Sequence, residues 1–218
     1  MVTTRLAALN LVERRTVTLH NWDMVHFRRP RTEYASAVID PSRSWKLLEE
    51  RRAVVTNTRH RQILDIVIEN MKQETVADLE GVMSTLSAEP EFHFWNDGDD
   101  FGPKGPDGVR RYYEELFVSQ AHVLEFAPER IFLDDGGLVG EGFLRQIYPG
   151  RAAYQLGLIA DDPGTDYLIE FRQLLIWAVD DAGKITSVNS YNSGPTRIEK
   201  LTREQLPKAY LEIMNATR

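Results

Sequence analysis

The chain has 218 residues, 42% of them hydrophobic, which is enough for one packed core but not for two. It has no cysteine, which excludes disulfides and thiolate chemistry, and a reducing cytoplasm is the expected compartment. The formal net charge is −7, so nucleic acid is not an expected partner. No stretch approaches the roughly 20 consecutive apolar residues that span a membrane, so a membrane is not an expected partner either.

Residues 1–56 differ from the rest of the chain. Their aromatic residues, among them Trp22, Phe27 and Tyr34, are scattered without a period, yet the segment is too apolar for a disordered tail. A helix start is expected near Pro41. We therefore predict an N-terminal extension that packs on the core or on a neighbouring subunit.

Helical periodicity begins with the core. The apolar residues of 63–71 recur at three and four positions and predict a helix that begins near Thr58. A second helix is expected over 76–86, ended by Pro90. Pro106, followed by an acidic residue, opens a third helix.

The remainder of the pattern indicates strands. Phe92 and Phe94 alternate with His93 and Trp95, which predicts a short strand before the third helix. Helices followed by long strands indicate an α+β domain with one curved, mostly antiparallel sheet. The further expected elements are strands over 124–133, 138–148, 152–160, 167–179 and 184–191, and a C-terminal helix over 201–215.

Three segments carry a family resemblance. Asp78–Val82, Gly105–Tyr113 and Val179–Ile185 resemble, in order and spacing, the SnoaL-like polyketide cyclase and ketosteroid isomerase superfamily. That superfamily shares its cone-shaped fold with nuclear transport factor two. The resemblance implies a helix-lined cone around an apolar pocket, with residues 57–218 as the SnoaL-like domain and residues 1–56 outside it. It also implies acid–base chemistry, usually without a metal.

The residues of the ketosteroid isomerase itself are not repeated in this chain. By the resemblance, its carboxylate base falls at Asn96, its tyrosine near Asn70 and its protonated acid near Leu175. All three residue types depart from that pattern. The resemblance therefore implies the fold and a pocket, but not the isomerase mechanism.

The end of the 92–97 strand carries the main catalytic candidates. A carboxylate beside an indole is desolvated, which raises its pKa, so Asp97 is a candidate acid or base and His93 its proton partner. Two alternatives stay open. Asp97 can simply build a turn, and His93 points outward if Phe92 and Phe94 face the core.

Further candidates line the expected pocket. Tyr113 and Asn96 would hold a developing negative charge, although a tyrosine here can also be a packing residue. Glu141, Arg145 and their neighbours are either ion pairs on the convex face or at a dimer interface, or a charge pair inside the cone. The predicted substrate contacts are Trp95, Phe94, Tyr112, Asn70, Phe143, Gln173, Leu175, Trp177 and Asn192.

These residues predict a cofactor-independent lyase acting on a small hydroxylated aromatic or polycyclic compound, by elimination of water or retro-aldol loss of a small carbonyl. The alternatives are an isomerase or cyclase on a similar substrate, or a non-catalytic small-molecule-binding module. The sequence shows no metal-ligand set, phosphate loop or dinucleotide motif, so no metal or other cofactor is expected. The expected partners are a hydrophobic or aromatic small molecule and further copies of the chain, in a homodimer or higher homo-oligomer.

Overall fold

The computed structural model describes residues 38–96, 98–119, 121–207 and 210–211. Its helices and strands follow one another along the chain as α1 (Arg43–Val54), α2 (Thr58–Thr75), α3 (Leu79–Thr85), β1 (Leu86–Asn96), β2 (Asp99–Asp100), α4 (Gly105–Val118), β3 (Leu124–Asp134), β4 (Gly137–Tyr148), α5 (Gly150–Gln155), β5 (Tyr167–Val179), β6 (Ile185–Lys200) and a 3₁₀ turn (Arg203–Gln205).

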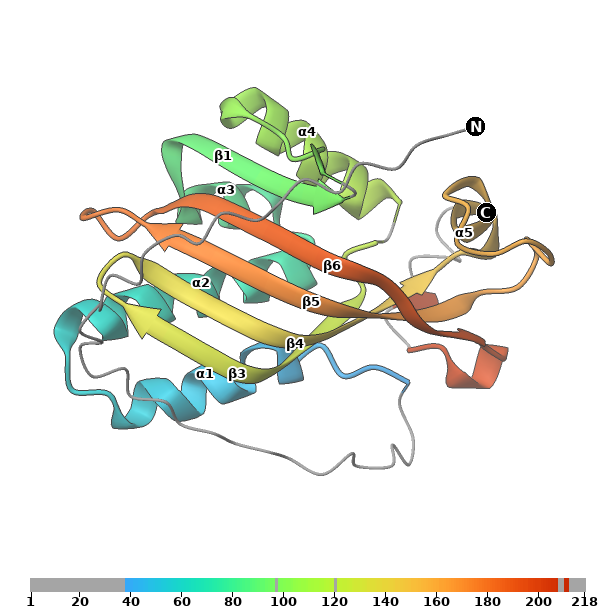
Figure 1. The fold of residues 1–218 in the computed structure, drawn as a ribbon, viewed down its shortest axis with the longest axis horizontal. Coiled ribbons are helices and arrows are strands. Elements are labelled where there is room, and N and C mark those ends of the chain that lie inside the picture. Colours follow the sequence, from blue (N-terminus) through green and yellow to red (C-terminus); the bar gives the residue numbers. More distant parts are fainter. Residues whose placement is uncertain (1–37, 97, 120, 208–209, 212–218) are drawn as a thin grey trace, which may run out of the picture.

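The strands form one curved sheet in the order β2-β1-β6-β5-β4-β3 (Figure 1). β1 and β6 run parallel, and the other neighbouring pairs are antiparallel. Figure 1 shows α2 and α3 behind the sheet, on the face that we call the inner face. Phe92, Leu138 and Trp177 lie on this face and pack with helix residues; His93 and Arg172 lie on the opposite, outer face. The predicted α+β class with a mostly antiparallel curved sheet is confirmed.

Two helices begin where local hydrogen bonding predicts them. The Asn57 side chain accepts hydrogen bonds from the backbone N–H groups of Arg59 and His60 at the start of α2. Pro106 lies in the first turn of α4, where its missing N–H costs nothing. The sequence prediction is therefore confirmed for both helices.

Other boundaries differ from the prediction. The predicted strand over 152–160 is wrong, because residues 150–155 form α5, in which buried Ala153 packs against Ile169 and Phe171. The second helix ends at Thr85, and β1 starts before Pro90, where its pairing with β6 is irregular.

The C-terminal end also departs from the prediction. β6 continues to Lys200, well beyond the predicted end of the strand at residue 191. Of the predicted helix over 201–215, the described residues show the 3₁₀ turn Arg203–Gln205 and two helical residues at 210–211. The other residues of that segment include several outside the described ranges.

The described part of the predicted extension packs on its own chain. Ile39 and Leu48 are 2% and 1% exposed. Ser44 Oγ accepts a hydrogen bond of 3.0 Å from the backbone N–H of Phe126 on the edge strand β3. Residues 38–56 thus complete the core and cover part of this sheet edge. Among the helices of the described ranges, none is both long and apolar enough to cross a membrane.

Candidate functional site

The two faces of β1 separate the predicted catalytic residues. Phe92 is 1% exposed and lies 6.0 Å from the Tyr113 ring, centroid to centroid. Because side chains alternate along a strand, His93 and Trp95 point to the outer face, where their rings stack 6.2 Å apart. The alternative in which His93 and Trp95 share the pocket with Tyr113 is therefore wrong, and the outward alternative holds for both.

His93 belongs instead to a polar cluster beside the β1–β2 turn. Its Nδ1 lies 2.7 Å from Asp100 Oδ2, and Lys104 Nζ lies 2.8 Å from the same oxygen. Asp100 Oδ1 accepts hydrogen bonds from the N–H groups of Phe94 and Gly102. The Lys104 ammonium, followed by these N–H groups, holds the pKa of Asp100 well below its usual range. The cluster ties the turn to the start of α4.

The side chains of two predicted catalytic residues lie outside what the structure describes. Asp97 lies outside the described residues, and Asn96 is described only as a strand residue at the end of β1. Their proposed roles as acid or base and as hydrogen-bond donor stay predictions.

The charged residues of the sheet lie on its outer face, so the alternative of a charge pair inside the cone is wrong. Arg172 pairs with Glu141 at 2.6 Å and lies over the Phe143 ring, 4.8 Å from its centroid. The prediction that Phe143 contacts substrate in the cone is therefore also wrong, since odd-numbered residues of β4 face outward there while Leu138 faces inward.

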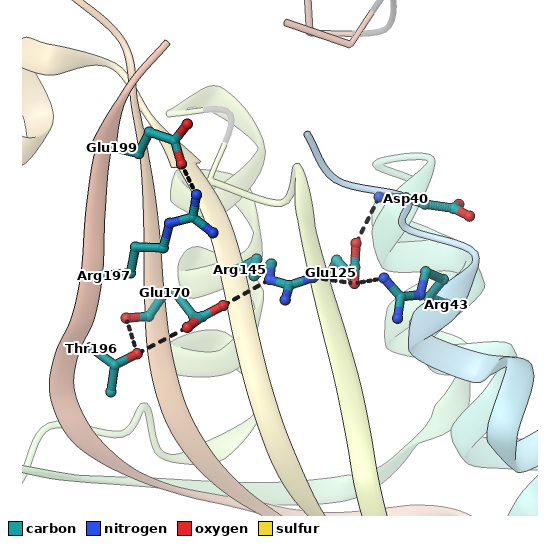
Figure 2. Close-up of polar contacts among 8 residues, drawn as sticks. All are labelled: Asp40, Arg43, Glu125, Arg145, Glu170, Thr196, Arg197 and Glu199. Carbon is teal, nitrogen blue, oxygen red and sulfur yellow. Dashed lines mark hydrogen bonds and ion pairs between the residues drawn. The ribbon is translucent and has the colours of Figure 1, made fainter. Parts of the chain in front are cut away.

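A second group of charges spans α1 and three strands (Figure 2). Glu125, fully buried, accepts a hydrogen bond from the N–H of Asp40 and pairs with Arg43 at 2.9 Å and Arg145 at 3.2 Å. Arg145 also pairs with Glu170 at 2.9 Å. Burial raises the pKa of Glu125, and the neighbouring N–H and guanidinium groups oppose that shift. This network fastens α1 to the sheet.

Residues of the inner face differ in how deeply they are buried. Leu138, Trp177 and Ile185 are buried against the helices. Phe94 and Leu175 lie on either side of Ser190 of β6; they belong to the same cluster but are partly accessible.

Several predicted contacts meet in this interior. Asn70, 3% exposed, donates a hydrogen bond of 2.8 Å from Nδ2 to Thr85 Oγ1, and its side chain also hydrogen-bonds the Tyr113 hydroxyl. The Tyr112 ring lies 5.2 Å from that of Phe94. The structure thus brings together Asn70, Tyr112, Tyr113 and Phe94, as the sequence predicts.

The predicted substrate contacts on β5 lie on the inner face, whereas the one on β6 lies at its margin. Gln173, Leu175 and Trp177 share the inner face, and Gln173 donates a hydrogen bond to Ser190 Oγ. Asn192 pairs opposite Gln173, but it is exposed and accepts a hydrogen bond from the N–H of Gly194. Asn192 therefore lies at the margin of the interior.

Glu74, near the end of α2, is the functional candidate that the sequence prediction missed. Burial raises its pKa from 4.5 to about 7, and its charge in turn raises the pKa of both Tyr112 and Tyr113. The residue as a whole is partly accessible to solvent. The sequence feature that could have pointed to Glu74 is its position four residues after Asn70, which places the two residues on one face of the helix.

This arrangement suits proton transfer at neutral pH. A carboxyl group with a pKa near 7 can both accept and give a proton. Burial keeps the Tyr112 and Tyr113 hydroxyls protonated, so they remain hydrogen-bond donors for a developing oxyanion. Burial also raises the pKa of Tyr148, which is near Tyr112, to about 12. Within the described ranges, no three His, Asp or Glu side chains are grouped to hold a metal ion.

The sequence matches no protein-family model and is not detectably similar to any curated protein. Solved structures of similar architecture include a putative SnoaL-like polyketide cyclase from Jannaschia sp. CCS1, 14% identical, with 64% of this chain and 90% of that chain covered at a TM-score of 0.49. SalBIII, an epoxide hydrolase/cyclase-like enzyme in pyran ring formation in the polyether salinomycin, is 16% identical, with 70% and 98% covered and a TM-score of 0.46. Rv0760c from Mycobacterium tuberculosis, in complex with estradiol-17β-hemisuccinate, is 17% identical, with 60% and 92% covered and a TM-score of 0.45.

At these identities, residue roles do not transfer between the chains, and the similarity concerns architecture alone. In this chain the helices pack on one face of a curved sheet whose first strand pairs in parallel with its last. That is a helix-lined α+β architecture with one curved sheet, as the sequence predicts.

Proposed function

We propose that this protein is a cofactor-independent enzyme that performs acid–base chemistry on a small hydroxylated aromatic or polycyclic compound. The reaction is a lyase reaction, either elimination of water or retro-aldol release of a small carbonyl fragment. The observation that carries the proposal is the Glu74 carboxyl group, whose pKa burial raises to about 7 and whose charge acts on the Tyr112 and Tyr113 hydroxyls.

In the retro-aldol reaction, the Glu74 carboxylate accepts the proton of a substrate hydroxyl, and that oxygen becomes the new carbonyl as the carbon–carbon bond breaks. The electron pair of that bond moves into an adjacent carbonyl, which becomes an enolate, and Tyr113 donates a hydrogen bond to its oxygen. Protonated Glu74 then returns its proton to the enolate carbon. Protons and electrons balance without a further reactant.

Elimination of water uses the same groups. Glu74 removes a proton from the carbon beside a substrate carbonyl, and Tyr113 stabilises the enolate. The enolate then expels the hydroxyl group on the next carbon, and protonated Glu74 supplies the proton that converts it to water. Both reactions require an electron sink in the substrate, for which a carbonyl conjugated to an aromatic ring is suited.

The apolar rings around these groups support an aromatic substrate. Phe94 and Tyr112 are partly accessible and lie beside each other on β1 and α4. Leu175 extends this apolar surface on β5. A planar hydrocarbon skeleton would bury its surface there, while its oxygen atoms meet Glu74 and the tyrosine hydroxyls.

The test is a screen of hydroxylated aromatic ketones and diols, followed by ultraviolet absorbance. With a substrate found, we expect Glu74→Gln to lower kcat by at least about 100-fold and Tyr113→Phe by at least about tenfold. Glu69→Gln, on the exposed side of α2, is the matched control and should retain activity. kcat should rise with pH through about 7 as Glu74 ionises. Unchanged turnover in Glu74→Gln would contradict the proposal.

A further inference from the structure

A group of apolar side chains on the outer face of the sheet is left uncovered by the described residues. We call it the outer patch, and five neighbouring strands contribute its members, which are Trp95, Tyr191, Leu174, Ile176, Val139 and Phe132. All six are at least partly accessible, and Trp95 and Tyr191 are 37% and 42% exposed. None of them belongs to the buried clusters of the described ranges. Figure 1 looks onto this face, and no described helix crosses its middle. A contiguous apolar surface of this kind marks an interaction site.

The first described residues of the chain lie on this same face. Ile39, 2% exposed, packs in a cluster with Ile147 of β4 and Leu168 of β5. Ile147 and Leu168 pair with each other, and each lies two residues along its strand from an outer-face charge, Arg145 or Glu170. Because alternate residues of a strand share a face, Ile39 covers one end of the outer face.

Polar contacts hold the chain at that end. The backbone N–H of Asp40 donates a hydrogen bond of 2.8 Å to Glu125 Oε2, and Arg43 pairs with Glu125 at 2.9 Å (Figure 2). Glu125 in turn belongs to the outer-face row that includes Glu170. Leu174 of the outer patch is four residues beyond Glu170 on β5, which is about 13 Å along the strand. The segment before residue 38 therefore joins the described chain close to the outer patch.

The composition of residues 1–37, which lie outside the described residues, suits this surface. The segment includes Trp22, Phe27 and Tyr34, and it has six arginines against three acidic residues, a formal charge of +3 in a chain whose total is −7. The rest of the chain is therefore strongly acidic. At about 3.3 Å per residue the segment can extend to about 120 Å, whereas five strands are about 20 Å across. Its length, charge and apolar content are all sufficient to cover the outer patch.

We propose that residues 1–37 of the same chain cover the outer face of the sheet, with their aromatic side chains against the outer patch. The site is on the face opposite to the proposed active site, so it is independent of the proposed function. Burial of the patch supplies the driving force, because apolar area removed from water stabilises the bound state. The covalent connection at residue 38 favours this occupant over a second copy, since a tethered segment is present at a high effective concentration.

Photochemical cross-linking of the full chain tests the proposal. The chain has no cysteine, so one introduced cysteine gives a unique attachment point. Asn189→Cys places it in the middle of the outer face, between His93 and Ile176 of the neighbouring strands, where it is labelled with benzophenone maleimide. We expect irradiation to produce cross-links to peptides from residues 1–37. Ser84→Cys, exposed on α3 at the helix side, is the matched control and should give none to that segment.

An equal mixture of unlabelled and nitrogen-15-labelled chains distinguishes the two occupants. Cross-links within one chain join peptides of the same isotope, and we expect this class. Cross-links that join peptides of different isotope would assign the outer face to a second copy and overturn the proposal. Cross-links to residues 1–37 that are no more frequent from Asn189→Cys than from Ser84→Cys would overturn it as well.

Alkylation of the cysteine variants without the benzophenone label provides a second measurement. A covered cysteine reacts only when the covering segment opens, so removing the aromatic side chains of the segment should raise its rate. We expect Trp22→Ser, Phe27→Ser and Tyr34→Ser together to accelerate the reaction of Asn189→Cys with a small maleimide at least about tenfold. The rate of Ser84→Cys should stay the same. Equal rates for Asn189→Cys with and without the three substitutions would contradict coverage by this segment.

Discussion

The Asn70 side-chain amide donates a hydrogen bond to Thr85 Oγ1 over 2.8 Å, and both residues are almost completely buried. Thr85 in turn donates its own hydroxyl proton to the carbonyl oxygen of Val82 at 2.6 Å. The Thr85 oxygen is therefore left to accept from Asn70, which fixes the orientation of the amide. This pair joins α2 to the end of α3 and holds Asn70 beside Tyr113.

Thr85→Val should lower the free energy of unfolding by about 1–3 kcal/mol, because it leaves the buried Asn70 amide without its acceptor. The measurement is urea denaturation. Thr75→Val is the matched control, since Thr75 donates its hydroxyl to the carbonyl of Met71 one turn earlier in α2, and no side chain of the described residues hydrogen-bonds to that hydroxyl. An equal loss in the two variants would show that the Asn70–Thr85 bond has no special weight.

Arg145→Met should lower the free energy of unfolding by about 3–5 kcal/mol, because the fully buried Glu125 and the nearly buried Glu170 both lose a guanidinium partner. Arg197→Met is the control. Arg197 pairs with Glu199, but its side chain is 56% exposed, so its removal should change stability by less than about 1 kcal/mol. Both variants are compared by chemical denaturation at neutral pH. Equal losses of unfolding free energy in the two variants would contradict the prediction that buried ion pairs matter more than exposed ones.

The pH dependence of the free energy of unfolding should report the raised pKa of Glu74. Its pKa is about 7 in the folded protein against an ordinary value of 4.5, so between these values the folded state binds more protons than the unfolded state. Its contribution to stability is therefore present below pH 4.5 and lost as the pH rises through 7. Glu74→Gln should exceed the wild type in stability at pH 8, by at most about 3 kcal/mol and by less if water reaches the carboxylate.

That advantage of Glu74→Gln should disappear near pH 4, where the wild-type carboxyl is protonated in both states. Urea denaturation of both proteins from pH 4 to pH 8 is the measurement, with Glu69→Gln as the exposed control. Parallel pH profiles for the wild type and Glu74→Gln would mean that Glu74 has the same pKa in both states.

Elements that carry a local signal could be predicted from the sequence. The apolar period of α2 and the side-chain cap at Asn57 require only neighbouring residues, and the same is true of Pro106 at the start of α4. α5 carries no such signal. Its helix depends on the burial of Ala153 against the inner face of β5, a tertiary contact that residues 150–160 do not reveal.

The site was predictable in part. Tyr113 and Asn70 fall on interior positions of amphipathic helices, which the resemblance and the helical period indicate. The orientation of His93 was a choice between two alternating faces, and only the packing of Phe92 decides it. Glu74 was missed because a glutamate near the end of a helix is usually solvated, and its electrostatic interaction is with Tyr112 and Tyr113 of α4, which are distant in the sequence.

The parallel pairing of β1 with β6 has a consequence for the order of assembly. Leu86 pairs with Ile185 and Trp95 with Tyr191, so the edge of β1 that faces β6 has no partner until residues 185–191 have left the ribosome. During synthesis that edge, with the apolar side chains of Phe92 and Phe94, is available to other nascent chains. Closure of the sheet between β1 and β6 is therefore a non-local step, and slow translation of the residues between these strands would prolong the interval in which aggregation competes with folding.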